Sequence, residues 1–525
     1  MVTDMAMAGM ASTARSSNAG LFLLACLVST VTWAGDSKFA SGVTLSERYS
    51  DNVNLGVTGS EQSEWVTEIS PRISVRRDGA RIKANLDYSL QGLLYANDAD
   101  SNKVSHNLNG RASAELVEEW FFLDATARIS QELNSLSGGT NVGGAVGMAN
   151  TTSVGAYSLS PYLKHRFGSL ATVEAKFSRD GVFIGDSTLS DSASTRYTLS
   201  AVSGNYFLPL SWGANYNKSD TSNSVGAGSG SERASVNARY SLSRKFGLRA
   251  NANMEKNDFT GVSAAARDYS SYGFGMFYTP SRRISMDALY NHSDSGNFVS
   301  GSVTLNPTLR TTVKASSSKR AFGRSYSLSL AHRTRQSNWN LSYSDDLTTS
   351  QQQYLNFLGS ADAYTCPSGK VYQQVGAPPP VGCTFDGVTA FFSQNHVNQT
   401  YVAKSLIGSI SHTLRRNTWL LSVFDTRREY QGLAGGSDTT RGLQASWSLK
   451  PAAHTTFTLT GGMSQAESST GNQQDDLWNI ALVATHQFQP KVSGILEVRH
   501  QERKSSLAGS DFTENSVAAR MNLAF

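Results

Sequence analysis

The sequence predicts an all-β protein, a transmembrane antiparallel up-and-down β-barrel of about 24 strands, with about 22 as the alternative. Three observations predict it: apolar and polar residues alternate along the chain, short and long connections alternate between the strands, and the final strand ends on an aromatic residue. In that strand Val517, Ala519, Met521, Leu523 and Phe525 share one face. Because a closing strand of this kind is typical of bacterial outer-membrane barrels, we interpret Met521, Leu523 and Phe525 as a membrane-insertion signal.

Residues 1–34 are predicted to be a signal peptide. Arg15 precedes an apolar run from Leu21 to Val31, and Thr32 and Ala34 supply small residues at the cleavage positions. The run is too short to span a bilayer as a helix. We therefore expect export, and a single barrel domain over residues 35–525.

Composition agrees with a barrel and excludes other classes. Hydrophobic residues make up 39% of the chain and the mean hydropathy is −0.31, as expected where polar lumen residues dilute apolar lipid-facing ones. The net charge of +5 is small, and basic and acidic residues are interleaved, so no nucleic-acid partner is expected. A soluble secreted β-solenoid or sandwich is the rival fold.

Individual strands have one apolar and one polar face. Ile82, Ala84 and Leu86 alternate with Lys83 and Asn85, and the pattern recurs near residues 234–242 and 478–484. A soluble sandwich would bury large apolar residues against a second sheet. The polar face opposite nearly every apolar one instead favours lipid outside and water inside.

The connections predict the orientation. Short ones are expected at 77–79, 117–119, 167–169, 243–245, 279–282, 415–417 and 489–491, and long polar ones at 132–152, 180–191, 217–231, 256–268, 346–400, 428–438, 465–475 and 502–511. Short periplasmic turns and long external loops are the outer-membrane pattern. Aromatic residues beside the short turns are expected to form the periplasmic girdle: Phe121, Phe167, Phe246, Tyr278, Trp339, Trp419, Phe457, Phe488 and Phe525.

Segment 298–324 decides the strand count. With both termini periplasmic the number of strands must be even. A tight turn at Asn306-Pro307-Thr308 would make strands of Val299–Leu305 and Leu309–Ala315 and leave Ser316–Arg324 as an external loop. Every later long connection then falls outside, which predicts about 24 strands.

The longest external loop, about 346–400, holds both cysteines that follow the leader, Cys366 and Cys383. Two nearby cysteines in an exported chain are expected to pair. The loop is then either stiffened to fold over or into the pore, or protected from proteolysis.

Catalytic, cofactor and metal sites are not expected. The histidines lack metal-ligand spacing, and His165, His412 and His486 are interpreted as membrane-interface residues. The glycine-rich stretch 138–144 lacks the strand-to-helix context of a phosphate loop. No local motif singles out a triad, so a barrel enzyme remains only an alternative.

The charged residues of the polar faces are candidates for lining the lumen. Both signs occur among many Ser and Asn residues, which suits a hydrated neutral or mildly charged solute better than one ion sign. Cross-strand pairs that only stabilise the barrel are the alternative interpretation. The candidates are Lys83, Asp87, Arg111, Glu115, Asp124, Arg128, Glu174, Lys176, Arg239, Arg249, Asp287, Glu497, Arg499 and Arg520.

Ordered motifs in the first part of the chain carry a family resemblance. They are Tyr49-Ser-Asp-Asn-Val-Asn-Leu55, Trp65-Val-Thr-Glu-Ile-Ser-Pro-Arg-Ile73, Leu86-Asp-Tyr-Ser-Leu90, and Glu115 to Asp124. This succession resembles outer-membrane barrels associated with the PEP-CTERM/exosortase system and exopolysaccharide clusters, within the β-barrel porin group.

The resemblance implies a place in the outer membrane of a Gram-negative bacterium and a role as conduit or accessory in exopolysaccharide export. Expected partners are outer-membrane lipid, the barrel-assembly machinery, and polysaccharide with its export apparatus. A general or sugar-uptake porin and a non-transporting surface scaffold of the same system are the alternatives.

Overall fold

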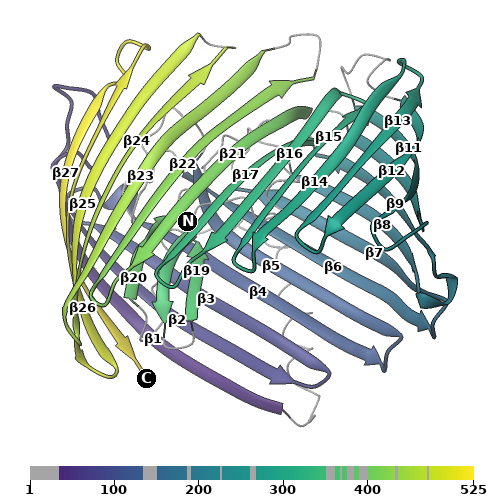
Figure 1. Cartoon of the computed structure of the whole chain (residues 1–525). Helices are drawn as coiled ribbons and strands as arrows, with labels where there is room; N and C mark the ends of the chain where they lie inside the picture. The colour runs from purple at the N-terminus through teal and green to yellow at the C-terminus, as the bar shows by residue number, and fades with distance from the viewer. Residues whose placement is uncertain are drawn as a thin grey trace, which may run out of the picture.

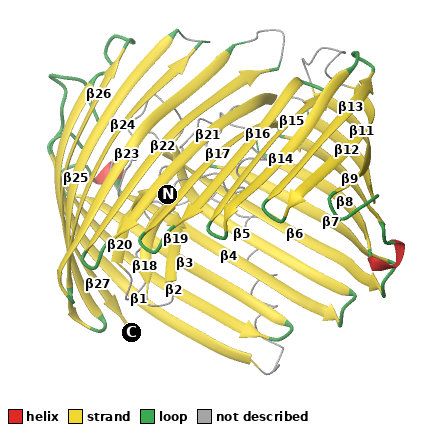
Figure 2. Cartoon of the chain, in the orientation of Figure 1, coloured by secondary structure: helices red, strands yellow, loops and turns green. Residues whose placement is uncertain are grey.

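Alternating residues form long strands in the computed structural model, which describes residues 35–133, 151–185, 191–224, 228–259, 268–349, 361–366, 369–374, 384–389, 400–431, 436–469 and 472–525. The first strands are β1 (Gly35–Ser50), β2 (Glu64–Gly79), β3 (Ile82–Tyr95), β4 (Lys103–Val117), β5 (Phe121–Leu133), β6 (Thr151–Phe167), β7 (Ala171–Ile184), β8 (Ser192–Ser203), β9 (Leu210–Asn223), β10 (Ser229–Ser241), β11 (Phe246–Phe259), β12 (Asp268–Ser281), β13 (Ile284–Ser293) and β14 (Phe298–Thr308). They are followed by β15 (Thr311–Arg320), β16 (Gly323–Arg333), β17 (Ser337–Thr349), β18 (Ala361–Cys366), β19 (Gly369–Gln374), β20 (Thr384–Thr389), β21 (Thr400–Thr413), β22 (Asn417–Tyr430), β23 (Ser437–Ala452), β24 (Thr455–Ser468), β25 (Gln473–Gln489), β26 (Val492–Ser505) and β27 (Phe512–Ala524). Two 3₁₀ turns, η1 (Ala99–Ser101) and η3 (Asn205–Phe207), are the red segments of Figure 2.

The wall is one closed antiparallel sheet of 24 strands. Each strand pairs with the next along the chain, except that β17 pairs with β21 across the inserted β18–β20. β1 pairs with β27 from Gly42↔Ala524 to Ser50↔Ser516, which places the purple start of the wall beside its yellow end (Figure 1). Closure leaves no unpaired edge, and the predicted 24-strand barrel is confirmed.

Among the residues that the structure describes, no helix is both long and apolar enough to cross a membrane.

The two rims of the barrel differ in their connections. The turn rim holds Gly35, Phe525 and short connections such as 80–81, 118–120 and 490–491, whereas the loop rim holds connections such as 51–63, 96–102 and 506–511. The predicted short turns lie within a few residues of the observed ones.

Several predicted loops are too long, because strands continue toward the loop rim after the apolar alternation ends. Segment 217–231 was predicted to be a loop, yet β9 and β10 remain paired up to Thr221↔Ser229. Residues on both faces are polar there, so the two-residue pattern no longer marks the strand.

Segment 298–324 forms two strands as predicted, but with different bounds. The turn lies at 309–310, and the register shift between Leu305 and Thr308 accommodates Pro307, which has no N–H for the ladder. The predicted external loop Ser316–Arg324 is wrong. Ser316 to Arg320 pair with β16 up to Arg320↔Gly323, leaving a two-residue connection at 321–322.

The outer face of the wall is apolar. Large side chains such as Phe274 (70% exposed) and Leu482 (48%) have no protein cover, as expected of a surface that contacts lipid. At the turn rim Phe167, Tyr278, Trp339, Trp419, Phe457, Phe488 and Phe525 are 41–67% exposed, whereas Phe121 and Phe246 are partly covered. The ring of His165 stacks on that of Trp120 with the centroids 3.7 Å apart, and the ring of His486 meets that of Phe488 edge-on with the centroids 4.8 Å apart.

The chain between β17 and β21 forms a separate three-stranded sheet, ordered β19-β18-β20. β20 contacts β22, β23 and β24 of the wall. Figure 1 shows this small sheet within the outline of the barrel. The predicted loop 346–400 is thus corrected at both ends, because β17 continues to Thr349 and β21 begins at Thr400.

Candidate functional site: the barrel lumen

Burial distinguishes the two faces of the wall. On β26 Leu496 and Val498 are about half exposed, while Glu497 and Arg499, which alternate with them, are 6% and 4% exposed. Side chains on the concave face of a closed sheet converge and cover one another. The polar face is therefore the lumen face.

Hydroxyl and amide groups form cross-strand pairs on this lumen face. Ser160 Oγ donates to Ser178 Oγ at 2.8 Å, and Thr198 Oγ1 donates to Asn217 Oδ1 at 2.7 Å. Ser316 and Ser327 lie 2.7 Å apart by their hydroxyl oxygens. These neutral pairs come from widely separated strands, so uncharged donors and acceptors line much of the lumen.

A first charged network, which we call the seam network, lies where β26, β27 and β1 close the barrel. It consists of Arg48, Glu497, Arg499, Arg520 and Glu514. Glu497 pairs with Arg499 and also attracts Arg48 and Arg520 electrostatically. Glu514, 1% exposed, accepts a hydrogen bond from Ser50 Oγ at 2.8 Å.

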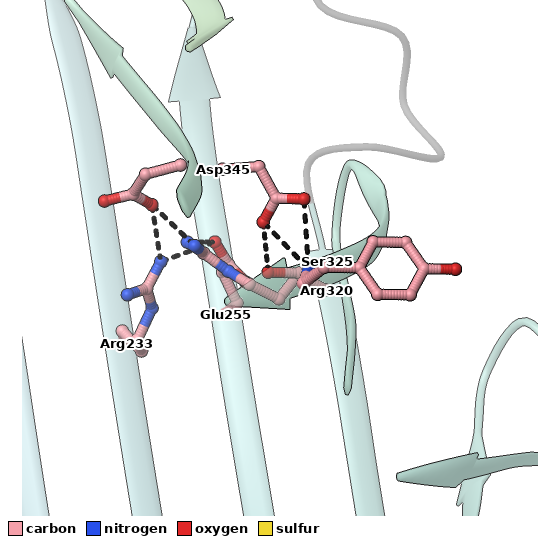
Figure 3. A network of polar contacts seen from close by, with 7 residues as sticks. Arg233, Glu255, Arg320, Ser325 and Asp345 are labelled. Carbon is pink, nitrogen blue, oxygen red and sulfur yellow. Dashed lines mark hydrogen bonds and ion pairs between the residues drawn. The ribbon is translucent and has the colours of Figure 1, made fainter. Parts of the chain in front are cut away.

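A second network, which we call the corner network, consists of Arg233, Glu255, Arg320 and Asp346. Figure 3 labels the first three of these residues and the neighbouring Ser325 and Asp345. Arg233 and Arg320 each approach Glu255 Oε1 to 3.0 Å, and Arg320 also pairs with Asp346 at 2.5 Å. Beside it, Asp345 accepts hydrogen bonds from Ser325 Oγ at 2.5 Å and from the backbone N–H of Tyr326 at 3.0 Å.

The corner network spans part of the wall. β12, β13 and β14 lie between β11, which carries Glu255, and β15, which carries Arg320. Along a flat sheet those two strands would be about 19 Å apart, so a 3.0 Å contact requires the wall to curve sharply. On β12, which lies within the curved part, the Asn291 side chain fills the space over Gly273, where a Cβ would lie 2.1 Å from Asn291 Oδ1.

Curvature also buries the side chains behind the corner network. Tyr269 on β12 and Phe298 on β14 are 5% and 9% exposed. Asp346 and Arg233, by contrast, remain 61% and 48% exposed. The corner network therefore presents charge to the open lumen near the loop rim.

Close to the small inner sheet, the wall presents a buried aromatic and charged platform. Tyr401 is fully buried and Arg428 lies over its ring at 4.9 Å. Tyr430 donates a hydrogen bond to Asp438 and meets Tyr401 edge-on at 5.9 Å. These residues belong to β21–β23, and β20 contacts the last two of those strands.

The strand parity places all the predicted charged candidates on the lumen face. Some of these candidates also contact one another in the folded barrel. Lys176 Nζ lies 2.9 Å from Asp124, and the neighbouring Glu174 lies 3.5 Å from Lys164. Arg249 pairs with Asp287 at 2.5 Å. Glu497, Arg499 and Arg520 meet in the seam network.

The other candidates have neighbours of different kinds. Asp87 accepts from Asn85 Nδ2 at 2.9 Å, and Glu115 accepts from the backbone N–H of Glu119 at 2.6 Å. Arg239 lies over the ring of Phe277 at 3.4 Å. Lys83 and Arg111 are exposed to the lumen, and Arg128 is partly covered. Contact of any candidate with a solute stays a prediction.

Sequence reasoning missed Arg48 and Glu514 of the seam network and all four residues of the corner network. Arg48 and Glu514 lie on polar positions of alternating strands, so closure of the first strand on the last could have paired them. Arg320 lies in a segment that was predicted to be an external loop. Arg233 is the direct cross-strand neighbour of Glu255, whereas Arg320 and Asp346 come from β15 and β17, and no local pattern reveals those contacts.

The predicted disulfide lies outside what can be described. Cys366 is the last residue of β18, but its side chain and Cys383 fall outside the described residues. Pairing of the two cysteines stays a prediction, as does the leader over 1–34. Among the described side chains, no group of three or more His, Cys, Asp or Glu residues is arranged to hold a metal ion.

Comparison with known proteins finds distant likenesses among solved structures and no family. No protein-family model and no curated protein matches the chain. Among solved structures, the siderophore receptor PirA from Pseudomonas aeruginosa matches 94% of this chain and 81% of its own at 11% identity and a TM-score of 0.43. The FrpB iron transporter from Neisseria meningitidis matches 93% and 82% at 10% identity and a TM-score of 0.46.

Likenesses at this level carry no inference about ligand or mechanism. The assignment as a transmembrane barrel rests on the strand pairing, the closure and the exposed apolar outer face described above.

Proposed function

We propose that this protein is an outer-membrane barrel that serves as conduit or accessory for exopolysaccharide export. The observation that carries the proposal is the chemistry of the lumen face. Its hydroxyl and amide pairs, such as Ser160–Ser178 and Thr198–Asn217, can exchange hydrogen bonds with sugar hydroxyls.

Charge on the lumen face supports a neutral or weakly charged solute. Several described lumen cations are paired with carboxylates, as in Lys176–Asp124, Arg249–Asp287 and the corner network. Neither sign dominates, so the lumen lacks the single-sign ring that selects one kind of ion. The resemblance of the N-terminal motifs to barrels of exopolysaccharide clusters adds the direction, which is export.

The proposed location follows from the outer surface and the expected leader. An apolar band facing outward on a closed barrel needs a membrane, and barrels of this kind occupy the Gram-negative outer membrane. Insertion would depend on the barrel-assembly machinery reading Met521, Leu523 and Phe525, of which Phe525 is 67% exposed at the turn rim.

An in-frame deletion in the native host tests the export role. Surface and periplasmic polysaccharide are measured together, with the wild-type gene returned as control. Loss at the surface with accumulation in the periplasm is expected. Unchanged polysaccharide in both pools would sink the export role and leave the uptake porin or the surface scaffold.

Conductance in planar bilayers separates those alternatives. An open uptake porin gives a large steady current, whereas an export conduit that needs its apparatus stays mostly closed alone. A scaffold keeps its activity when lumen charges are replaced but loses it when the long loops are changed.

A further inference from the structure

The outer face changes from apolar to charged along one boundary near the loop rim. On β22 the outward positions Trp419, Leu421 and Val423 are followed by Asp425, Arg427 and Glu429. The strand register extends this boundary across neighbouring strands. One row of cross-strand neighbours is apolar and consists of Val423, Leu443, Met463 and Trp478. The next outward row toward the loop rim is polar and consists of Asp425, Arg441, Gln465, Asp476 and Lys504.

We call the outward charged residues of β21–β26, together with the neutral Gln465 among them, the charged band: Lys404, Asp425, Arg427, Glu429, Arg441, Gln465, Glu467, Asp476, Glu502 and Lys504. Its members contact one another. Arg441 pairs with Glu467 at 3.0 Å and its Nε donates to Gln465 at 2.7 Å. Lys404 pairs with Glu429 at 2.7 Å. Even so, Arg427, Arg441 and Lys504 keep 53%, 55% and 74% of their side-chain surface exposed.

The opposite rim of the same strands has a different chemistry. Outward positions there carry Trp419, Trp447, Phe457, His486 and Phe488, and the two tryptophans stack at 5.5 Å. Aromatic rings suit the headgroup level of an ordinary phospholipid leaflet. The two ends of these strands therefore present different side chains to the membrane, mainly aromatic at the turn rim and charged at the loop rim.

An apolar groove of about 350 Å³ adjoins the charged band on the outer face of β24–β27 and β1. Leu459, Ile480, Leu482, Val498 and Val517 line it, with Tyr49 and His500 toward the loop rim. The ring of His500 lies tilted against that of Trp478, with the centroids 4.6 Å apart. Trp478 Nε1 donates to Glu502 at 2.6 Å, and Glu502 pairs with Lys504 at 3.4 Å. Groove and band thus form one continuous surface.

We propose that this surface binds lipopolysaccharide of the outer leaflet. Arg427, Arg441 and Lys504 would contact the sugar-linked phosphates by charge-assisted hydrogen bonds. Carboxylates of the band, such as Asp476, would join the divalent cations that bridge those phosphates. An acyl chain would occupy the groove. The inference rests on the proposed outer-membrane location, but it does not depend on transport.

The test uses the full barrel purified in mild detergent. Lipid A retained per barrel and the shift in unfolding temperature are measured with added lipopolysaccharide and, separately, with phosphatidylglycerol. The double variant Arg427→Gln/Arg441→Gln is compared with the lumen variant Lys176→Gln, which also removes positive charge but lies inside the wall. Cell fractionation of each variant reports its location.

We expect lipopolysaccharide to stabilise the wild type and Lys176→Gln, and the double variant to bind it about tenfold more weakly or worse, as expected if roughly 1.4 kcal/mol or more of binding is lost. Equal retention by the double variant, or equal stabilisation by phosphatidylglycerol, would overturn the site. A barrel found outside the outer membrane would overturn the location instead, so the two failures are distinguishable.

Discussion

The seam network and the corner network use the same residue types to different ends. In the seam network Arg499 and Glu497 keep 3% and 8% of their side-chain surface exposed, and all members come from adjacent strands. In the corner network Asp346 keeps 61% of its side-chain surface exposed, and Arg320 and Asp346 reach the network from β15 and β17, which are separated along the wall from β10 and β11. Burial, more than composition, therefore decides whether lumen charge is enclosed within the wall or faces the open lumen.

The largest effect is expected from Glu497→Gln. The substitution removes the carboxylate that pairs with the buried Arg499 and attracts Arg48, and breaking such a buried pair costs about 3–5 kcal/mol. Unfolding in urea, followed by loss of the compact electrophoretic form, measures it. Asp87→Asn, a partly covered lumen carboxylate, should stay within about 0.5 kcal/mol of wild type. Similar losses for both variants would remove the distinction between the networks.

A change in ion selectivity, with little loss of stability, is expected at the corner. Asp346→Asn and Arg233→Gln remove opposite charges, so they should shift the cation-to-anion permeability ratio by roughly twofold in opposite directions. Because both side chains are about half exposed or more, stability should fall by no more than about 1 kcal/mol. Reversal potentials in planar bilayers test this. Unchanged ratios would show that the solute path avoids the corner.

Thiol labelling sharpens the contrast between covered and open lumen wall. Ser446 on β23 is 4% exposed, whereas Ser327 on β16 is exposed. With Cys366 and Cys383 replaced by serine, Ser327→Cys should react faster with a hydrophilic maleimide than Ser446→Cys. Deleting residues 361–389 should speed the labelling of Ser446→Cys but not that of Ser327→Cys, because β20 contacts β23. No change at 446 would mean that the inner sheet does not cover it.

The smallest effect is expected at Asp294, in the turn behind the corner. Hydrogen bonds from the hydroxyl and backbone N–H of Ser270 lower the pKa of Asp294 below its ordinary value of 3.8. Since the folded pKa is depressed, this contribution is present above pH 3.8 and is lost as pH falls through the folded value. Amide exchange at Ser270 should rise in that window, and Asp294→Asn should abolish the pH dependence.

Sequence patterning predicted the features that depend on one strand at a time. Alternation through Leu496, Glu497 and Val498 identified both faces of β26, and the even parity of the strands led to the correct count. The bounds failed where alternation stopped short of the strand end, as at Thr221 on β9 and Ser316 on β15. Strand pairing there continues through backbone hydrogen bonds that side-chain periodicity does not report.

The networks themselves were only partly predictable. Glu497 and Arg499 lie two residues apart on one face, so their proximity follows from strand geometry. Glu255 and Arg320 meet only because the wall curves between β11 and β15. That curvature involves several strands at once and is a property of the closed sheet, which no single strand's pattern reports.

The pairing of β1 with β27 also sets a condition on biogenesis. Thr44 and Asn522, hydrogen-bonded at 2.8 Å, are 478 positions apart in the chain. Contacts this distant form late, after hairpins between chain neighbours. Until the last strand arrives, β1 and β26 each present a free edge that can recruit another chain. A stalled or truncated molecule would therefore be prone to aggregate. The arrival of β27 removes both free edges at once, because it pairs with β26 on one side and with β1 on the other.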